Sequence, residues 1–235
     1  MSTVGVVRPF TKFRDRRGFA WWLALVVCKP ILVALRRADW RGVERLPRSG
    51  GAVLAANHVS HIDPLLVAEM LLAQDRVPRF LAKDTLFRGP VLGWWFRAAG
   101  HVKVDRAAGR AAYDDAVTAA RAGCLLLVYP EASITKRPDG LPMAMKSGAV
   151  RIALEASVPL VPVAQWGAQE ILPAYSGRLR WGRRRSVTVL VGEPIPLHDL
   201  RDLDQARAVE LGRIRLEERL TSMVRELSGT LPSPQ

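Results

Sequence analysis

Short apolar runs of strand length alternate along the chain with longer segments of helical pattern, and this alternation limits the possible folds most strongly. The clearest runs are GAVLAAN, CLLLVY, LVPVA and VTVLV, at residues 51–57, 124–129, 160–164 and 187–191. Helices are predicted between and after them, the longest over 203–227, where apolar residues recur on one face. With 49% hydrophobic residues the chain can bury a core of this kind. The pattern predicts an α/β fold with a mostly parallel sheet flanked by helices.

Positive charge is concentrated in two places. Residues 1–50 hold 11 basic and 3 acidic residues, a net +8 of the total +13, and residues 178–185 add five arginines. Such clustering indicates an anionic partner, either a membrane surface or a nucleic acid. Trp181 is the only aromatic residue within the arginine cluster, and a surface that stacks bases needs more, so no nucleic acid is expected.

Residues 19–35 read FAWWLALVVCKPILVAL, a 17-residue apolar segment. As a helix it reaches roughly 26 Å, short of the ~30 Å hydrocarbon core of a bilayer. We expect a helix, kinked near Pro30, that lies in or dips into the membrane from the cytoplasmic side. A buried core helix and a true span are the alternatives. The chain is thus divided into a basic, membrane-associating helical segment (1–40) and an α/β domain (41–235), with a polar linker expected at 39–49.

Chemically reactive side chains follow four predicted strands, at the point where each strand ends. His58 follows the run 51–57, Lys83 follows 79–82, Arg106 follows 102–104, and Glu131 follows 124–129. In parallel sheets ligands bind outside the carboxyl ends of the strands. The sequence therefore predicts that these residues contribute to one site.

The stretch NHVSHIDP, residues 57–64, is the most informative segment. Asp63 and Pro64 form a typical helix start, so Asp63 could be no more than an N-terminal cap. A loop could equally fold His58 back onto the Asp63 carboxylate, giving a general base and the acid that orients it. His61 makes the spacing similar to a metal site, but no HExxH helix or third histidine cluster supports one, so no metal is expected.

An ordered set of blocks resembles the glycerolipid acyltransferases, the 1-acyl-sn-glycerol-3-phosphate acyltransferase family. NHVSHIDP resembles the NHx4D block of that family. The other matching blocks are RGVERLP (41–47), AKDTLF (82–87), GHVKVDR (100–106), YPE (129–131), KSGA (146–149) and VPLVPV (158–163). Together they cover roughly residues 41–195.

The resemblance implies transfer of a fatty acyl group from acyl-CoA or acyl-carrier protein to a lipid hydroxyl, with no bound cofactor. In this pattern His58 deprotonates the hydroxyl, Asp63 supports it, and no acyl-enzyme forms. A thiolate leaves readily, so it is chiefly the hydroxyl that needs activation.

The remaining residues that the resemblance assigns to substrate binding are Asn57, Lys83, Arg106, Glu131, Ser133 and Lys146. Lys83 and Arg106 would bind an acceptor phosphate. Arg106 could instead form a surface ion pair with Asp105, and Glu131 could be a helix cap.

The third block departs from the usual Pro-Glu-Gly-Thr pattern. Ala132 and Ser133 replace Gly and Thr, and Ile134 occupies the usual basic position. Lys136 and Arg137 follow closely and could supply the charge on a rearranged loop. This departure favours a bulkier or uncharged acceptor headgroup.

The expected function is conversion of 1-acylglycerol-3-phosphate to phosphatidate, at the cytoplasmic face of the cell membrane, by a peripheral or monotopic enzyme. The first alternative is an acyltransferase for another lysophospholipid, a glycolipid or an amino lipid. The second is a non-catalytic basic module that binds membranes or nucleic acid. The sequence contains no GxSxG, P-loop or GxGxxG motif.

Overall fold

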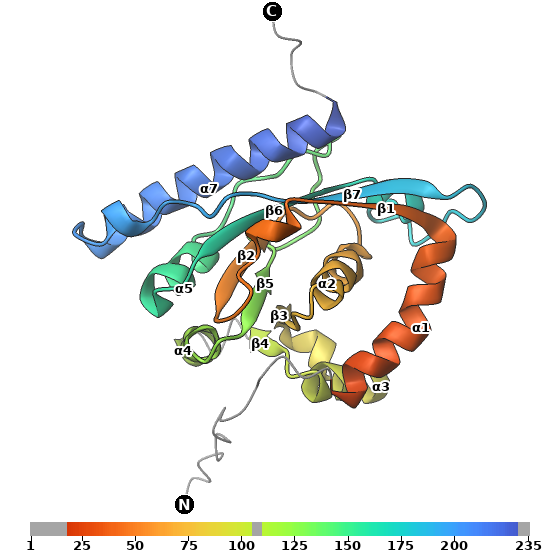
Figure 1. The fold of residues 1–235 in the computed structure, drawn as a ribbon, viewed down its shortest axis with the longest axis horizontal. Coiled ribbons are helices and arrows are strands. Elements are labelled where there is room, and N and C mark those ends of the chain that lie inside the picture. Colours follow the sequence, from red (N-terminus) through yellow and green to blue (C-terminus); the bar gives the residue numbers. More distant parts are fainter. Residues whose placement is uncertain (1–17, 105–109, 230–235) are drawn as a thin grey trace, which may run out of the picture.

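A seven-stranded sheet forms the centre of the molecule, in the order β1-β7-β6-β2-β5-β3-β4 (Figure 1). The structure is a computed structural model and describes residues 18–104 and 110–229. The strands are β1 (Arg36–Arg41), β2 (Ala52–Ala56), β3 (Pro78–Lys83), β4 (Val102–Val104), β5 (Leu125–Val128), β6 (Leu160–Trp166) and β7 (Arg185–Val191). Strands β6, β2, β5, β3 and β4 pair in parallel, whereas β7 pairs antiparallel with β6 and parallel with β1. The predicted α/β fold with a mostly parallel sheet is confirmed.

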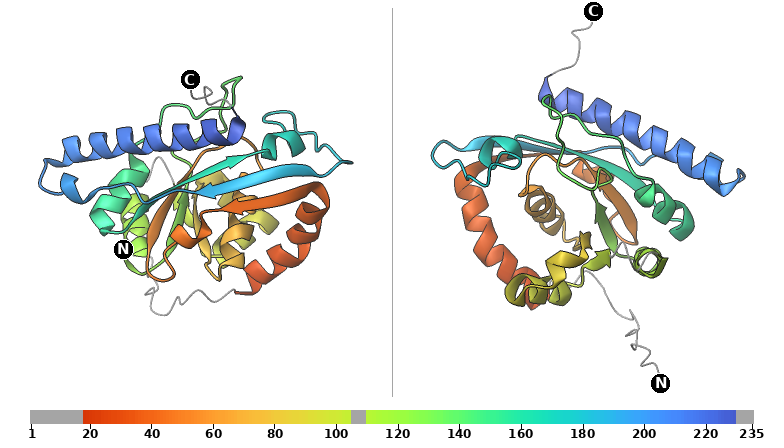
Figure 2. Two further views of the ribbon diagram at one scale, coloured as in Figure 1. Left: turned by 45° about the horizontal axis from the view of Figure 1, so that its top comes forward. Right: turned by 180° about the vertical axis from the view of Figure 1, so that it is seen from behind.

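Helices cover both faces of this sheet, as the two views of Figure 2 show. They are α1 (Phe19–Leu35), α2 (Asp63–Ala73), α3 (Pro90–Ala98), α4 (Arg110–Arg121), α5 (Gly148–Ala156), α6 (Ala168–Ile171) and α7 (Gln205–Ser228), with short 3-10 turns at Val43–Arg45, Asp84–Phe87 and His198–Leu200. Residues of β2 alternate between two cores. Val53 and Ala55 belong to the core that contains residues of α4, α5 and α7, and Leu54 to the core with α1, α2 and α3. Strand β2 is therefore apolar on both faces, as buried parallel strands are.

The segment expected to be a polar linker, 39–49, is not one. Its first three residues belong to β1, which pairs with β7 from Arg36↔Arg185 to Arg41↔Leu190. The sequence RRADWR has no apolar alternation, because β1 is an edge strand held by its backbone ladder, and of its polar side chains only Arg36 is buried. Strand β1 also crosses the boundary expected at residue 40.

Helix α1 packs on the protein at its two ends and is exposed between them. Trp21 is buried near the start, edge-on to Phe80 and Trp95, and Leu32 and Leu35 are buried near the end. Pro30 lies inside the helix, as predicted from the sequence. Figure 1 shows α1 running along one side of the molecule, from α3 to the start of β1. The two ends of α1 are therefore buried, as the alternative of a core helix requires, whereas its middle is exposed.

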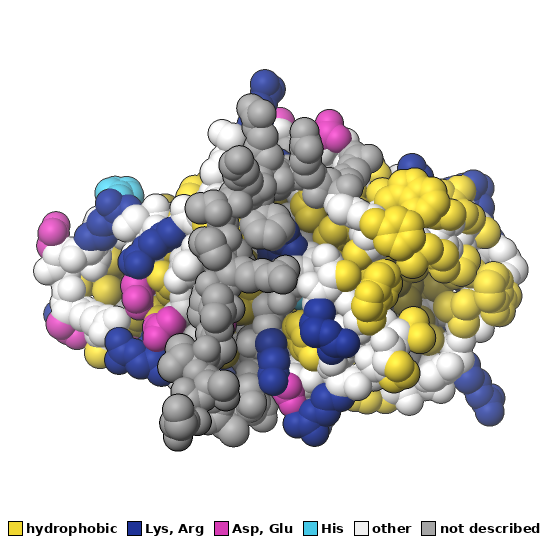
Figure 3. Space-filling view, turned by 90° about the horizontal axis from the view of Figure 1, so that it is seen from below, with side chains coloured by type: hydrophobic (Ala, Val, Ile, Leu, Met, Phe, Trp, Pro, Cys, Tyr) yellow, Lys and Arg dark blue, Asp and Glu magenta, His cyan; other side chains and the backbone are white. Residues whose placement is uncertain are grey.

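The exposed part of α1 is strongly apolar. Seen from below, hydrophobic side chains gather over the region of α1 and α3 (Figure 3). The exposed α1 members are Phe19, Trp22, Val26, Val27, Ile31 and Val33. Within the described ranges, none of the helices is both long enough and apolar enough to cross a bilayer.

Candidate active site

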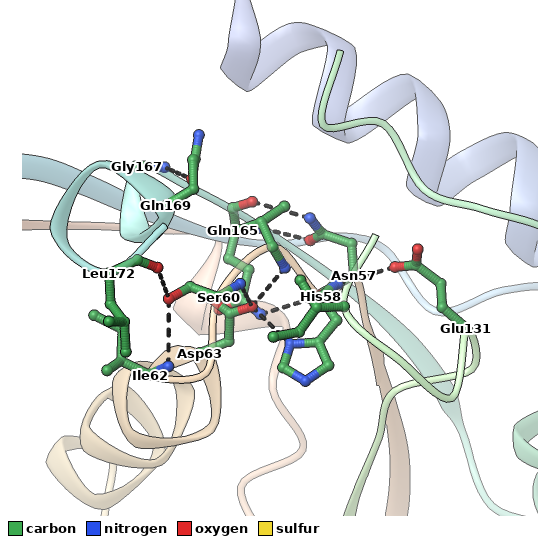
Figure 4. Close-up of polar contacts among 12 residues, drawn as sticks. Asn57, His58, Ser60, Ile62, Asp63, Glu131, Gln165, Gly167, Gln169 and Leu172 are labelled. Atoms are coloured by element: carbon green, nitrogen blue, oxygen red, sulfur yellow. Dashed lines mark hydrogen bonds and ion pairs between the residues drawn. The ribbon is translucent and has the colours of Figure 1, made fainter. Parts of the chain in front are cut away.

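The loop between β2 and α2 carries the central pair of side chains. His58 Nδ1 lies 2.8 Å from Asp63 Oδ2 (Figure 4). The same carboxylate oxygen accepts hydrogen bonds from the backbone N–H groups of Val59, at 2.6 Å, and Ser60, at 2.7 Å. Asp63 is wholly buried, whereas 16% of the His58 side chain is exposed. The loop thus folds the histidine back onto the aspartate, as one of the two sequence-based alternatives requires.

The other alternative, Asp63 as a simple helix cap, is wrong. Asp63 is the first residue of α2, and the position before it, Ile62, makes no side-chain capping bond. The Asp63 carboxylate bonds backward, to the amides of the loop, rather than forward to the helix. It therefore fixes the shape of the loop that presents His58.

Burial and hydrogen bonding determine which atoms of this pair carry a proton. Burial raises the pKa of Asp63, and the hydrogen bonds from His58 and the two loop amides oppose that rise. A carboxylate oxygen can only accept, so the bond places the proton of a neutral imidazole on Nδ1 and leaves the Nε2 lone pair free. Figure 4 shows this second ring nitrogen pointing away from the other polar groups drawn. The arrangement is that of a general base with its orienting acid.

Asn57 positions the loop and leaves no surface for a substrate, contrary to the expectation from sequence. Its side chain is wholly buried. Its amide nitrogen donates to the carbonyl oxygen of Gln165 at 3.1 Å, and its Oδ1 accepts from the Gln165 N–H at 2.8 Å. The side chain of Gln165 in turn donates to the Asn57 carbonyl oxygen at 2.6 Å. These three bonds tie the end of β2 to the neighbouring strand β6.

Glu131 clamps the histidine loop from the opposite side. Its Oε1 accepts from the backbone N–H of His58 at 2.9 Å, and its Oε2 accepts from the N–H of Met143 at 2.8 Å. Burial raises the pKa of Glu131, and both backbone bonds counteract this. The His58 carbonyl oxygen accepts from the N–H of Thr135 at 2.8 Å. No helix begins at Glu131, so the capping alternative is wrong, and the carboxylate instead joins the loop after β2 to two parts of the loop between β5 and α5.

Tyr129 is a part of the site that the sequence did not reveal. Its ring stacks on the His58 imidazole, with centroids 4.2 Å apart and planes inclined by 28°. Burial, and then the charge of Asp63, raise the pKa of its hydroxyl well above the ordinary value. Tyr129 directly follows β5, so its position at the carboxyl edge of the sheet was the available signal.

The residues that depart from the usual third block lie in the loop after Glu131. Ala132 has a positive φ of 60°, a conformation that favours glycine. Ile134 is buried, so the side chain at the usual basic position points into the protein. Ser133 is half-buried, and Lys136 is exposed.

The structure gives Arg137 a partner of its own. Its guanidinium forms two hydrogen bonds to Asp139, at 3.0 and 2.6 Å. The Arg137 charge is therefore largely neutralised within the loop, which weakens its expected role as a replacement cation.

The remaining predicted residues are placed less directly. Lys83 ends β3 and is exposed at the carboxyl edge of the sheet, where β5 separates its strand from β2. Lys146 is also exposed, and its backbone N–H donates to the Pro130 carbonyl oxygen at 2.9 Å. Arg106 lies outside the described residues. Within them, no group of three or more His, Cys, Asp or Glu side chains is arranged to hold a metal ion.

Fold and site together define an α/β protein with a hydrogen-bonded Asp–His pair at the carboxyl edge of a mostly parallel sheet. The family model described as Acyltransferase matches residues 37–166, more than half of the chain. The chain belongs to the acyltransferase family, which confirms the resemblance of its sequence blocks.

Relatives and a solved structure agree with this assignment. The chain is 30% identical over 194 residues to the chloroplastic 1-acyl-sn-glycerol-3-phosphate acyltransferase BAT2 of Brassica napus, covering 80% of this chain and 54% of that protein. It is 25% identical over 208 residues to the 1-acyl-sn-glycerol-3-phosphate acyltransferase of Streptococcus pneumoniae, covering 86% and 72%. The crystal structure of PlsC, the 1-acyl-sn-glycerophosphate acyltransferase of Thermotoga maritima, superposes with a TM-score of 0.69 at 25% identity, covering 87% of this chain and 78% of that one. The chain spans about half the length of the plant relatives that it matches.

Proposed function

We propose that this protein transfers a fatty acyl group from acyl-CoA or acyl-carrier protein to the free hydroxyl of 1-acylglycerol-3-phosphate, giving phosphatidate. The observation that carries the proposal is the His58–Asp63 pair, with one imidazole nitrogen bound to the carboxylate and the other without a partner among the described contacts. The names of the relatives from Brassica napus and Streptococcus pneumoniae support this acceptor.

The chemistry follows from the geometry of the pair. His58 Nε2 takes the proton of the acceptor hydroxyl as its oxygen attacks the thioester carbonyl carbon. The C–S bond then breaks, and the leaving thiolate recovers the proton from the imidazolium. Asp63 stabilises the transient imidazolium and keeps the ring oriented. The acyl group passes directly between the two substrates, and no covalent intermediate on the protein is needed.

One observation favours a second acceptor class. With Ile134 buried and Arg137 paired to Asp139, the loop after Glu131 presents less free positive charge than its sequence suggests. A lysolipid with a neutral or larger headgroup, such as a glycolipid or an amino lipid, would need fewer cations there.

We also place the protein at the cytoplasmic face of the membrane, in contact with anionic lipid through α1. The exposed apolar middle of α1 and the net +8 of residues 1–50 support this location. Apolar burial and attraction to anionic headgroups act together in such peripheral binding.

A direct assay tests the acceptor and the donor. The full chain is incubated with labelled acyl-CoA or acyl-carrier protein and a panel of lysolipids that carry the same acyl chain but different headgroups. Labelled phosphatidate as the main product, lost in His58→Ala, is the expected result. Transfer mainly to another lysolipid would favour the second acceptor class. No transfer to any acceptor would favour the non-catalytic binding module.

A further inference from the structure

Exposed apolar side chains are concentrated on two helices, α1 and α3. Nine of the thirteen large hydrophobic residues exposed in the described ranges belong to α1 and α3. On α3 these are Val91, Leu92 and Trp94, which are 78%, 49% and 42% exposed. Isolated exposed apolar residues are ordinary, but a concentration of this kind marks an interaction surface.

The two helices form one surface rather than two patches. The indole N–H of Trp95, on α3, donates to the carbonyl oxygen of Ala20, on α1, at 2.9 Å. The rings of Trp21 and Trp95 meet edge to face with centroids 5.4 Å apart. Figure 3 shows hydrophobic side chains gathered on this side of the molecule. The buried contacts therefore hold the exposed faces of α1 and α3 in a fixed relation.

A basic hollow adjoins α3. Its cavity of about 620 Å³ is lined by Asp84, Phe87, Arg88, Arg97, His101 and Lys103. Asp84 forms ion pairs with both Arg88 and Lys103, and these charges keep its pKa below the ordinary value. Three cations against one carboxylate leave the hollow with an excess of positive charge. Arg88 and Arg97 stand before and near the end of α3, so they flank its apolar residues along the chain.

We propose that α3 is a second membrane contact, which together with α1 forms one docking face for an anionic bilayer. Val91, Leu92 and Trp94 enter the interface, while Arg88, Arg97 and Lys103 meet the lipid phosphates. Trp side chains prefer the membrane interface, and basic residues beside an apolar face favour anionic lipid. This inference rests on the proposed function insofar as that function requires substrates held in a membrane.

The first experiment measures co-sedimentation of the full chain with phosphatidylcholine vesicles, with and without phosphatidylglycerol. The triple variant Val91→Gln, Leu92→Gln, Trp94→Gln leaves α1 unchanged and alters only exposed side chains. Its affinity for both kinds of vesicle should fall at least about tenfold. Ile214→Gln, at an exposed apolar position of α7 in the opposite helix layer, is the matched control and should bind like the wild type.

The charged part of the face has its own variant. Arg88→Gln should reduce the preference for phosphatidylglycerol while leaving binding to pure phosphatidylcholine unchanged, because only the electrostatic attraction is removed. Wild-type vesicle binding by the triple variant, with an unchanged melting temperature, would overturn the proposal. So would a wild-type dimer in sedimentation velocity that the triple variant converts to monomer, because the face would then bind a second copy.

An activity measurement separates this inference from the proposed function. With a short-chain lysolipid that dissolves as monomers, the triple variant should turn over like the wild type, since the catalytic loop is untouched. If neither protein transfers acyl groups but the vesicle results hold, the proposed function fails and the docking face stands. If the triple variant and the wild type bind vesicles equally and both turn over normally, the docking face fails and the proposed function stands.

Discussion

Tyr129 and His58 lie face to face, with their ring centroids 4.2 Å apart. The contact limits rotation of the imidazole around the hydrogen bond that joins it to Asp63. Tyr129 comes from the end of β5 and His58 from the loop after β2, and the two strands are neighbours in the sheet. The sheet itself therefore sets the orientation of the base.

Replacing Tyr129 tests this restraint. Tyr129→Leu removes the stacked ring, and the loss of an aromatic contact worth about 0.5–1.5 kcal/mol should lower kcat roughly two- to tenfold. KM should change little. Tyr129→Phe keeps the ring and should stay close to wild type. If Tyr129→Phe lost as much as Tyr129→Leu, the hydroxyl rather than the ring would be the active feature.

The second prediction concerns the base. His58→Ala should reduce acyl transfer by about 10²–10⁴-fold, the usual contribution of a positioned general base. His61→Ala is the matched control, because His61 lies three residues away, is exposed and makes no bond to Asp63 among the described contacts. Steady-state rates on the same lysolipid measure both. A His58→Ala variant with more than about a tenth of wild-type rate would contradict the role.

The third prediction separates stability from activity at Asp63. Burial holds the folded-state pKa of Asp63 above its ordinary value of 3.8, so ionisation costs folding free energy as pH rises from about 3.8 through the raised pKa. Asp63→Asn removes this cost and retains a carbonyl oxygen for the loop amides.

The asparagine variant should therefore gain stability relative to wild type as pH rises through that window. Urea unfolding at a series of pH values measures the difference. Its kcat should nevertheless fall by orders of magnitude, though less than in His58→Ala, because a neutral amide cannot stabilise the imidazolium. A variant that loses stability relative to wild type as pH rises would refute the buried-charge explanation.

Glu131 provides the fourth prediction. In Glu131→Gln, the side-chain NH₂ group faces one of the two backbone N–H groups that now donate hydrogen bonds to the carboxylate. An unsatisfied buried donor of this kind costs about 1–3 kcal/mol, so the free energy of unfolding and kcat should both fall. Glu193→Gln, at an exposed ion pair with Arg45, should stay within about 0.5 kcal/mol of wild type. Equal stability of Glu131→Gln and wild type would show that the clamp is dispensable.

The fifth prediction concerns the acceptor phosphate. If Lys83 meets it, Lys83→Met removes a charge-assisted bond worth about 1.5–3 kcal/mol, or roughly 10- to 150-fold in kcat/KM. The loss should appear with a phosphate-bearing lysolipid and not with a neutral one of the same acyl chain. Arg137→Met should have a much smaller effect, because Asp139 already neutralises Arg137. Equal losses on both lysolipids would assign Lys83 to the acyl donor or to the fold.

The sequence predicted the part of the site whose residues lie close together in the chain. His58 and Asp63 are five residues apart, and the strand before them and the helix after them are both clear in the apolar pattern. The sheet also followed from its apolar strands. Strand β1 was missed because an edge strand with polar side chains lacks that pattern.

The supporting contacts could not be predicted, because their partners are remote in sequence. Asn57 bonds to Gln165, 108 residues away, and His58 bonds to Glu131, 73 residues away. Only the order of strands in the sheet brings them together. The family resemblance suggested substrate binding for Asn57, whereas its buried side chain and its hydrogen bonds to Gln165 assign it to the scaffold.

Helix α1 ends at Leu35 and β1 begins at Arg36, with no residue between them. A flexible tether would let a catalytic unit drift and tilt above the surface that it serves. Here the helix that faces outward and the outermost strand of the sheet are one continuous piece of chain, braced by the packing of Leu32 and Leu35. The working height of His58 above any surface that α1 contacts is consequently built into the fold. If α1 docks on a membrane as proposed, a lipid acceptor must reach His58 at that fixed distance, and the enzyme cannot adjust it by moving a tether.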